Sequence, residues 1–381
     1  MRVLTRLTSD VSPEQWDALV GTESPFLEWG WLASLEESRC VGGQTGWSPQ
    51  HLALYRGEEL VAACPLYVKT NSEGEFVFDY SWANAAYRGG IEYYPKMLVG
   101  VPFTPATGIR FLVSPELDRR GIIRAMGKAL RDLCDEHEIS SVHVNFCHED
   151  EAEALAEVGF LERAGIQYKW RNHGYGTFED YLGALRHKRR KEIRRERRIL
   201  GEQGIEIEAL RGDAIPEDLY ARMYRIYLTT VDKFSWGRRY LNEEFFALLR
   251  ERFAKNLCFL VARREEEIVA GTFNVEKSDV LYGRYWGTFE ELRYLHFNVC
   301  YYATIEYCIA NGVQRFEPGA GGEFKWLRGF DAEATRSMHY LRDPRLAEAV
   351  ERFLEAERAE TSRTIDVMGE QSALKGRPMG S

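Results

Sequence analysis

The segment spanning residues 280–330 restricts the fold of this chain more than any other stretch of its sequence. An aromatic-rich strand at 280–286 leads through a polar turn into a helix at 296–311. A second strand at 313–317 then enters a glycine-rich turn at 319–322. This order of strand, loop, helix and strand is typical of α/β units, in which loops and helix N-termini direct backbone N–H groups to one place. Such a place can hold an anion or a developing oxyanion.

Two structural units are predicted from the chain length and from a repeated order of elements. The 381 residues exceed one ordinary domain. Residues 1–165 and 166–345 each read as hairpin strands followed by a loop, a helix and a strand, and residues 346–381 read as a helix with a frayed polar tail. The pattern, rather than sequence identity between the halves, predicts an α/β (α+β) fold of two similar units.

The expected elements cover most of both units. In the first unit we expect strands at 50–56, 60–68 and 75–80, a long loop at 81–108, a helix at 118–137 and a strand at 141–146. In the second unit we expect a basic helix at 178–203, a strand at 205–210, helices at 216–230 and 242–254, and strands at 257–263 and 267–276. Charged turns between apolar runs predict β-hairpins at 51–68 and 257–276.

Composition favours a cytoplasmic protein without a membrane span. Hydrophobic residues make up 45% of the chain, which is ample for buried cores, and the net charge of −9 does not steer nucleic acid toward the surface as a whole. No segment approaches the roughly 20 apolar residues of a membrane span, and the N-terminus lacks an apolar signal region. The seven cysteines form no CxxC pair, so we expect free thiols. Nothing in the sequence indicates an oligomeric state.

Residues 186–198 are an exception to the acidic balance, because they carry nine Lys or Arg against two Glu. One interpretation is a solvated helix face with a buried apolar stripe on its other side. The other is a contact with phosphate or with the backbone of a tRNA, whose counterion release makes binding salt-dependent. The candidate residues for that contact are Arg186, Lys188, Arg189, Arg190 and Arg194.

A long loop in the first half carries polar aromatic residues and turn-forming residues. The segments EYYPK at 92–96 and PFTPATGIR at 102–110 place Tyr94, Lys96 and Thr104 between a strand and a helix. A rigid loop explains the prolines, whereas a substrate clamp explains the density of hydroxyl and aromatic groups. Both interpretations stay open, and Trp82 of the same loop is a further candidate contact.

Two residues of the 280–330 segment are candidates for proton transfer. His296 is either a local contact at the helix start or a general base near a substrate amine. Glu317 ends a strand beside the glycine turn, where it either acts as a base or pairs with Arg315, Lys325 or Arg328. Asn298 suits the N-cap of the helix.

Several other kinds of site are excluded by missing motifs. The eight histidines show no HxH or HxxxH spacing, so we predict no metal site. There is no GxSxG and no GxxxxGK[ST] sequence, so serine hydrolysis and nucleotide hydrolysis are not expected.

Several segments together resemble a known family. In the first half these are SPFLEWGWLASLEES at 24–38, GWSPQHLALY at 46–55 and the run from 76 to 110. In the second half they are the run from 168 to 197, RYWG at 284–287, LHFNVCYYATIEY at 295–307 and FEPGAGGEFKWLRGF at 316–330. The chain is identified by these segments as similar to the FemAB-like predicted N-acyltransferases, or peptidoglycan biosynthesis/recognition proteins, of the GNAT superfamily.

This resemblance implies tandem GNAT-like units, each with a mixed, mostly antiparallel sheet flanked by helices. It implies an acyltransferase that forms an amide on the amine of a small molecule or peptide, without a cofactor and with aminoacyl-tRNA or acyl-CoA as co-substrate. Glu317 and His296 are the expected catalytic residues. The expected substrate contacts are Lys233, Arg284, Tyr285, Trp286, Asn298, Tyr301, Glu323, Lys325 and Arg328, with Trp82, Tyr94, Lys96 and Thr104 from the first half.

The chain departs from the family pattern at three positions. The turn that usually reads GAQGEHK has Gly321 and Phe324 here, and the usual LHFE has Asn298 in place of Glu. The pyrophosphate loop of acetyl-CoA enzymes and the coiled-coil arm of the Fem ligases are also absent from the sequence. Two alternatives to aminoacyl transfer therefore stay open. One is a non-catalytic module that recognises a peptide or cell-wall precursor, and the other is a transferase that uses acyl-CoA or serves a biosynthetic pathway.

Overall fold

The structure is a computed structural model that describes residues 1–233, 238–322 and 324–375. The chain forms two units. Unit 1 comprises Met1–Ile166 and Ala334–Arg363, and unit 2 comprises Gln167–Glu333 and Thr364–Ser381. The boundaries fall inside strand β9 (Leu161–Arg171), strand β15 (Asp331–Leu341) and helix α13 (Pro344–Glu370).

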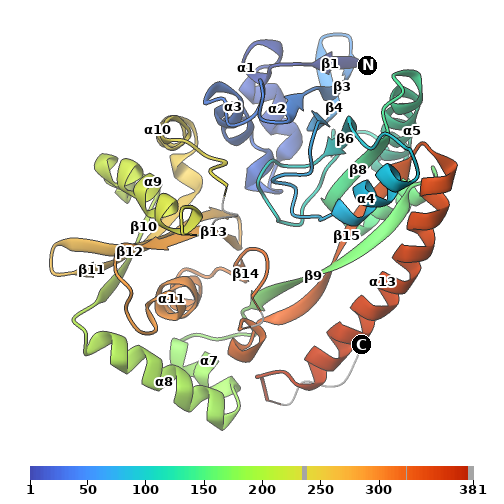
Figure 1. Ribbon diagram of the computed structural model, residues 1–381. Helices are drawn as coiled ribbons and strands as arrows, with labels where there is room; N and C mark the ends of the chain where they lie inside the picture. Colours follow the sequence, from blue (N-terminus) through green and yellow to red (C-terminus); the bar gives the residue numbers. More distant parts are fainter. Residues whose placement is uncertain (234–237, 323, 376–381) are drawn as a thin grey trace. The chain divides into compact units, whose positions relative to one another are not determined.

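Unit 1 begins with a small antiparallel sheet and short helices (Figure 1). The sheet has the order β1-β3-β4-β7. Its strands are β1 (Arg2–Leu4), β3 (His51–Arg56), β4 (Glu59–Cys64) and β7 (Leu112–Val113). The helices are α1 (Leu7–Asp10), α2 (Pro13–Val20), the 3-10 turn Pro25–Leu27 and α3 (Trp29–Glu37). Ser12 caps α2 by accepting from the N–H of Gln15, and a proline at the first helical position lacks an N–H that has no partner there anyway.

The larger set of strands in unit 1 has the order β15-β8-β6-β5-β2. Strands β6 and β8 run parallel, and the other pairs are antiparallel. The strands not yet given are β2 (Trp47–Pro49), β5 (Leu66–Lys69), β6 (Lys96–Val99) and β8 (Ser141–Cys147). The remaining helices are α4 (Tyr80–Arg88), α5 (Arg119–Glu136) and α6 (Glu149–Ala156).

Helix α5 forms the crossover that parallel strands require, and its apolar face builds the core of unit 1. Ile123, Met126 and Leu130 recur at a spacing of three and four residues, which places them on one face. They pack into the same cluster as Val142 and Val144 of β8. This burial fixes α5 against the sheet, because each fully buried side chain of this size contributes about 1.5–3 kcal/mol.

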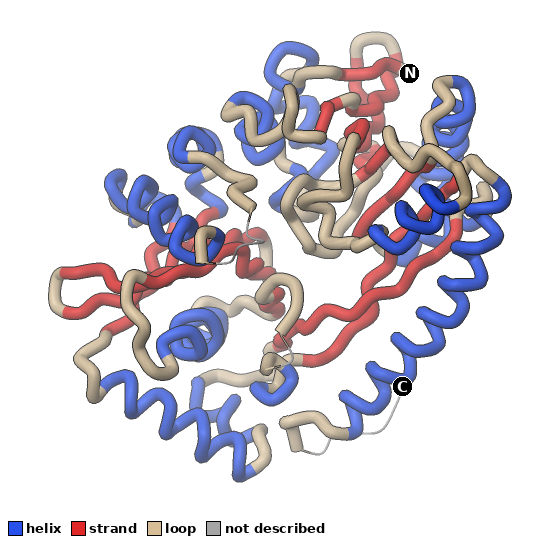
Figure 2. The backbone as a smooth tube through the Cα atoms, viewed as in Figure 1, coloured by secondary structure: helices blue, strands red, loops and turns tan. Residues whose placement is uncertain are grey.

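Unit 2 contains strands in the order β10-β11-β12-β13-β14-β9. Figure 2 draws the strands in red. Strands β13 and β14 are parallel, and the other pairs are antiparallel. The strands are β10 (Glu206–Arg211), β11 (Leu257–Arg264), β12 (Glu267–Lys277), β13 (Val280–Thr288) and β14 (Arg315–Glu317). The helices are α7 (Phe178–Ala184), α8 (His187–Gly201), α9 (Glu217–Val231), α10 (Glu243–Arg252), α11 (Leu295–Phe297) and α12 (Ala303–Ala310). Short 3-10 helices lie at Gly212–Ala214, Ala254–Asn256 and Trp326–Arg328, the last of which is η5.

Helix α9 approaches strand β13 so closely that only glycine fits at the contact. A Cβ atom on Gly287 would lie 1.9 Å from the carbonyl oxygen of Ile226. The hydroxyl of Thr230 also donates to the Trp286 carbonyl at 2.6 Å. These contacts hold the end of β13 in place, and this end lines the candidate site described below.

The predicted fold class is confirmed, since both units are α/β with mixed, mostly antiparallel sheets flanked by helices. Both predicted β-hairpins are present, as β3–β4 and β11–β12. The predicted strand at 60–68 is two strands, β4 and β5, which pair in different sheets on either side of Pro65.

Three other predicted elements are wrong. The expected strand at 75–80 is a turn followed by the first residue of α4, because Glu75 and Asp79 bend back to buried lysines. The expected long loop at 81–108 contains α4 and β6. The expected single helix at 178–203 is two helices, α7 and α8, since Leu185 adopts extended backbone and forms a β-bridge with Leu374.

Candidate functional site

A pocket of about 300 Å³ lies in unit 2 beside the parallel strands β13 and β14. Its lining comes from β12, β13, the helix that begins at Leu295 and the glycine turn after β14. The structure brings together these predicted site residues: Arg284, Tyr285, Trp286, His296, Tyr301 and Lys325. Arg284 and Lys325 are cations, and no described residue of the lining is a carboxylate. The pocket is therefore suited to a ligand with an anionic or electron-rich group.

The glycine turn adopts backbone angles that favour glycine. Gly319, Gly321 and Gly322 have φ values of 84°, 69° and 87°, in the left-handed region where side chains are strained. A Cβ atom on Gly319 would also lie 3.2 Å from the carbonyl oxygen of Gly283 in β13. The glycines thus let the turn fold tightly against the strand and complete the wall of the pocket.

Lys325 is the buried cation of this pocket, with 3% of its surface exposed. Its ammonium donates to the carbonyl of Gly319 at 2.7 Å and reaches that of Ala320 at 3.5 Å. Burial lowers its pKa to about 8, and the nearby Cys300 opposes that shift only in part. Lys325 therefore stays mostly protonated at neutral pH while it is poorly shielded by other charges.

His296 lies against two aromatic rings in the same pocket. Its ring centroid is 4.6 Å from that of Trp286 and 5.4 Å from that of Tyr301. Burial lowers its pKa to about 4, and the positive charges of Arg328 and Lys325 add to the effect. At neutral pH the imidazole is therefore uncharged, so one ring nitrogen can accept a proton.

A π-helical segment, Asn298–Tyr302, links α11 to α12 and shapes one wall of the pocket. The wider turn brings Cys300 and Tyr301 to the lining, next to His296 on the preceding turn. Irregular helical turns of this kind are common at functional sites. The helix begins at Leu295, after Tyr294, which has a φ of 66°.

The prediction that Asn298 is the helix N-cap is wrong, because Tyr294 occupies that position. The buried side-chain amide of Asn298 instead donates to the Tyr294 carbonyl at 2.9 Å and to the Glu196 carbonyl at 3.3 Å. It therefore joins the π-helical segment to α8 rather than opening toward the pocket.

Glu317 lies outside the described lining of the pocket. Successive residues of a strand point to opposite faces, so Phe316 reaches the pocket and Glu317 does not. The Glu317 carboxylate is 5% exposed and lies 3.0 Å from Arg315 Nε and 3.5 Å from Lys169 Nζ. This arrangement corresponds to the ion-pairing interpretation of Glu317, with Lys169 as a partner that sequence reasoning missed.

Arg328 likewise serves contacts within the protein. Its guanidinium donates to the Tyr302 hydroxyl at 2.7 Å, to the Glu196 carboxylate at 3.2 Å and to the Phe324 carbonyl at 3.0 Å. It also stacks over the ring of Phe297, 3.7 Å from the centroid. Arg328 thus ties the turn after the pocket to helix α8 and to the π-helical segment.

Of the two remaining predicted contacts, the structure describes only Lys233, which lies elsewhere. Lys233 forms an exposed ion pair with Glu291 at 2.7 Å and is not among the described lining residues. Glu323 lies outside the described residues.

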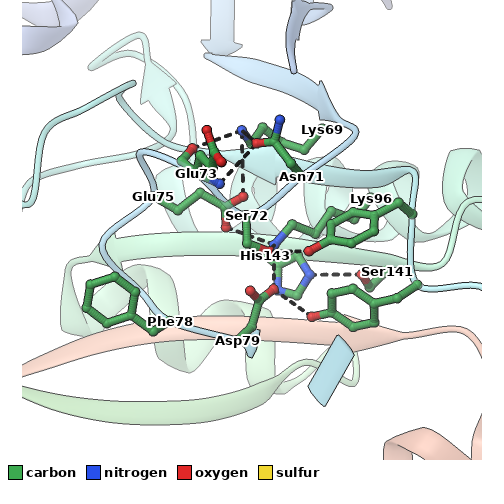
Figure 3. Close-up of polar contacts among 12 residues, drawn as sticks. Lys69, Asn71, Ser72, Glu73, Glu75, Phe78, Asp79, Lys96, Ser141 and His143 are labelled. Atoms are coloured by element: carbon green, nitrogen blue, oxygen red, sulfur yellow. Dashed lines mark hydrogen bonds and ion pairs between the residues drawn. The ribbon is translucent and has the colours of Figure 1, made fainter. Parts of the chain in front are cut away.

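Lys96, one of the predicted clamp residues of unit 1, belongs to a polar cluster rather than to a described pocket (Figure 3). Lys96 is fully buried and contacts Ser72 at 2.9 Å, Glu75 at 2.9 Å and Asp79. Lys69, its cross-strand neighbour on β5, is also buried and lies 3.8 Å from Glu75. The two carboxylates therefore offset the repulsion between the two lysines, while burial lowers the pKa of Lys69 to about 7.

The other first-half candidates are held by the same network or by the backbone. The Tyr94 hydroxyl hydrogen-bonds to Ser72 Oγ at 2.8 Å. Trp82 packs its ring edge against His339, with the centroids 4.9 Å apart. The buried Thr104 hydroxyl donates to the Pro102 carbonyl at 2.9 Å.

Two buried histidines, His143 and His339, also belong to this cluster. His143 and His339 are buried and share a hydrogen bond of 2.7 Å between their Nδ1 atoms. Burial lowers the pKa of His143 to about 3, and the Lys96 charge acts in the same direction. Burial also holds the pKa of His339 well below its usual value.

Helix α8 presents most of its basic residues to solvent. Arg189 pairs with Glu192 at 2.8 Å, and Arg194 pairs with Glu179 at 2.5 Å. Arg186, Lys188 and Arg190 make no ion pair within the described part of the chain. The predicted buried stripe of α7 and α8 is present, with Tyr181, Leu182, Leu185, Ile193 and Leu200 all buried.

Sequence reasoning missed several lining residues. Thr272 and Asn274 of β12 and Cys300 of the π-helical segment line the pocket. Alternation along β12 was a usable signal for the first two, since both occupy one face of a predicted strand. The position of Cys300 depends on the π-helical turn, for which the sequence offers no comparable signal.

Among the described residues no group of three or more metal-binding side chains is present, and none of the helices is both long and apolar enough to cross a membrane.

These features define a two-unit α/β protein with a pocket at the parallel strands of its second unit. Over residues 7–376 the chain matches the family model FemAB_like, described as peptidoglycan biosynthesis/recognition, and it belongs to this family. The predicted family is thereby confirmed.

Solved structures share the fold at low sequence identity. The crystal structure of FemX is 11% identical, with a TM-score of 0.57 over 92% of this chain and 100% of that chain. L-PGS from Bacillus licheniformis is 9% identical, with a TM-score of 0.55 over 91% of this chain and 97% of that one. The C-terminal domain of a putative lysylphosphatidylglycerol synthetase from Agrobacterium fabrum is 11% identical, with a TM-score of 0.53 over 90% and 95%. No curated protein is significantly similar to the chain.

Proposed function

We propose that the protein is an N-acyltransferase that forms an amide on a substrate amine in the pocket of unit 2. The observation that carries this proposal is the pairing of Lys325 and His296 in one pocket. Lys325 is a protonated ammonium held by backbone carbonyls, and His296 is a neutral base. Acyl transfer needs a positive group for the oxyanion and an acceptor for the amine proton.

The proposed reaction begins with attack of a neutral amine on the carbonyl carbon of an ester or thioester donor. A new C–N bond forms, and the carbonyl oxygen becomes an oxyanion that the Lys325 ammonium stabilises. His296 accepts the proton that the nitrogen loses. The intermediate then collapses, the bond to the donor oxygen or sulfur breaks, and the leaving group takes a proton. Arg284, half-buried in the same lining, is placed to contact an anionic part of donor or acceptor.

We favour an aminoacyl group carried by tRNA as the donor. The basic surface of α8 supports this choice because it belongs to the same unit as the pocket. The solved relative described as a putative lysylphosphatidylglycerol synthetase is compatible with an aminoacyl group, although its likeness extends to the fold alone. The donor is a co-substrate, and the mechanism needs no resident cofactor. The seven free cysteines, six of them buried, fit a reducing cytoplasmic setting.

One observation favours a recognition module as the second candidate. Phe324 is 59% exposed at the position where the family motif has His. A module of this kind binds a peptide or cell-wall fragment and shows no turnover. An acyl-CoA-dependent transferase is the third candidate, and it uses the same pocket with a thioester donor.

The decisive experiment supplies the protein with aminoacyl-tRNAs or acyl-CoAs together with a panel of amines, and detects a new amide by mass spectrometry. We expect product from the wild-type protein and a loss of about 10²–10³-fold in kcat for Lys325→Met, typical of removing an oxyanion contact. Lys128→Met is the matched control, because Lys128 is exposed on α5 and pairs only with Asp132 among the described residues. Binding without product from any donor would contradict the proposal and support the recognition module.

A further inference from the structure

A second cavity of unit 2, about 320 Å³ in volume, lies beside η5, the turn that directly follows Lys325. It shares no lining residue with the pocket proposed for acyl transfer, which is called the transfer pocket below. Its walls come from the start of α8, from η5 and from the end of α13 with the segment that follows it. Arg186, Lys188 and Arg189 contribute cations, and Trp326 contributes an aromatic ring.

The wall formed by the C-terminal segment is fixed by the backbone. The N–H of Arg186 donates to the carbonyl of Ala373 at 2.9 Å, and Leu185 forms a β-bridge with Leu374. The N–H of Lys375 donates to the carbonyl of Ala184, also at 2.9 Å. Ala373 is 3% exposed. The part of the predicted frayed tail that the structure describes is therefore docked, and it gives the cavity a defined shape.

The cavity carries a surplus of positive charge on an acidic protein. Its described lining contains three cations and one carboxylate, Glu370. Arg189 is engaged with Glu192, whereas Arg186 and Lys188 are exposed and form no ion pair with any described residue. Two exposed cations in one cavity lining, neither in an ion pair with a described residue, favour a phosphate or another anion.

Trp326 adds a second kind of recognition. Its half-buried indole is part of the cavity lining and contacts no other aromatic ring among the described residues. Cations that follow a phosphate backbone, combined with an aromatic ring on which a base stacks, are the usual elements of single-stranded nucleic acid sites.

We propose that this cavity binds a nucleotide unit, with its phosphate on Arg186 and Lys188 and its base on Trp326. The unit belongs either to a free nucleotide or to an RNA strand. This inference deepens the proposed function, because η5 follows Lys325 without a break, and a nucleotide bound there lies on the turn that supplies the transfer pocket. The inference also goes beyond that function. It assigns the nucleotide contact to the N-terminal end of α8 and the C-terminal segment, rather than to the whole basic helix.

The test measures binding of a short fluorescent single-stranded RNA to the full chain at low salt, with AMP and inorganic phosphate as competitors. We compare Arg186→Glu/Lys188→Glu with Lys191→Glu/Arg198→Glu, which makes the same charge change on the same helix at residues outside the cavity lining. The first pair should raise Kd at least tenfold and lower the slope of log Kd against log salt by about 0.7, as expected for the loss of one phosphate contact with a single strand. The second pair should raise Kd less than threefold.

Trp326 provides an independent readout. Trp326→Ala should weaken RNA binding about tenfold, as expected for the loss of one stacked base, and leave competition by inorganic phosphate unchanged. Trp326→Tyr keeps a ring and should stay within threefold of the wild type. If AMP displaces the RNA with a Kd similar to that of the RNA itself, the ligand is a free nucleotide. If the RNA binds and AMP does not displace it, the ligand is an RNA strand.

Equal losses for the two charge-reversal pairs, or no binding of RNA and AMP by the wild-type protein, would overturn the proposal. Failure of the proposed function is separable from this result. Lys325→Met should bind RNA like the wild type, so RNA binding without any amide product would refute the acyl transfer and leave the nucleotide site standing.

Discussion

The two units each join a pair of parallel strands through a helical crossover, yet they treat a buried lysine in opposite ways. In unit 1, Lys96 at the start of β6 is surrounded by carboxylates and hydroxyls. In unit 2, Lys325 after β14 donates to backbone carbonyls and faces a pocket. A buried cation with carboxylate partners therefore serves the fold, whereas one held by neutral carbonyls keeps its charge available for a ligand.

The pKa values of the two lysines follow from the same difference. Burial alone disfavours both charged forms, but Glu75 and Asp79 outweigh it and raise the pKa of Lys96. Lys325 has no described carboxylate partner, so burial prevails and lowers its pKa to about 8. The crossovers differ as well, because α5 is a regular helix whereas the second crossover contains a π-helical turn at the pocket.

The largest effect is expected from Lys96→Met, which should destabilise unit 1 by about 3–5 kcal/mol. The substitution leaves buried Glu75 with Lys69 at 3.8 Å as its lysine partner and leaves buried Asp79 with no ion pair to a described lysine. Urea unfolding measures the loss, and Lys96→Met/Glu75→Gln/Asp79→Asn should recover part of it. A single variant as stable as the wild type would mean that the cluster does not support the fold.

Acidification from pH 6.5 to pH 5 is expected to lower the free energy of unfolding by up to about 3 kcal/mol per pH unit. His143, His339 and His296 have a pKa below the ordinary value of 6.5, because burial disfavours their charged forms. The unfolded chain therefore binds more protons in this window, and the stability that these three histidines contribute above pH 6.5 is lost as pH falls toward their folded values. Glu75 acts in the opposite direction, since burial raises its pKa to about 7, and it offsets one histidine.

Urea midpoints at pH 7.5, 6.5 and 5.5 check this expectation. A midpoint that stays constant across the range would contradict the assignment of neutral buried imidazoles. His143→Asn should flatten the dependence, because it removes one of the titrating groups.

The rate of acyl transfer should follow a bell-shaped pH profile that belongs to unit 2 alone. After correction for ionisation of the amine, kcat/KM should fall about tenfold per pH unit below about pH 4, where His296 becomes protonated. It should also fall about tenfold per pH unit above about pH 8, where Lys325 loses its proton. His296→Asn should remove the acid limb. A profile that keeps both limbs in this variant would exclude His296 as the proton acceptor.

The smallest effect is expected from Glu317→Gln, which should change kcat by less than about threefold. Glu317 pairs with Arg315 and Lys169, and Lys169 retains Glu333 at 3.5 Å in the variant. The expected cost is about 1–3 kcal/mol of stability, measured by urea unfolding. A loss of a hundredfold or more in kcat at unchanged stability would restore Glu317 as a catalytic residue.

Much of unit 2 was accessible from the sequence because its signals are local. Alternating apolar residues and a charged turn specify the β11–β12 hairpin, and a strand, turn and helix around residues 280–311 specify the elements that line the pocket. The sequence therefore predicts that Lys325 and His296 lie in one region. The side of the strand on which Glu317 lies follows from its register with β13 and β9, which no local pattern fixes.

Unit 1 is harder to predict from the sequence because the contacts that form its polar cluster join residues that are far apart in the chain. In the sequence, Tyr94 and Lys96 belong to a polar aromatic run that is typical of pockets. In the structure, Glu75 and Asp79 fold back and form ion pairs with Lys96, and the Tyr94 hydroxyl is hydrogen-bonded. Nothing local distinguishes a lysine that will meet two carboxylates from one that will meet a ligand. The docked C-terminal segment was missed for the same reason, since Leu374 pairs with Leu185, far away in the sequence.

The most direct test of the difference between the units is a crossed measurement on the two lysine variants. The kcat of amide formation and the urea midpoint are determined for Lys325→Met and Lys96→Met at a temperature where both remain folded. Lys325→Met should lose about 10²–10³-fold in kcat with a nearly unchanged midpoint. Lys96→Met should lose stability while its folded fraction keeps a kcat within about threefold of the wild type. A kcat that collapses in Lys96→Met and survives in Lys325→Met would place the chemistry in unit 1 and contradict the account.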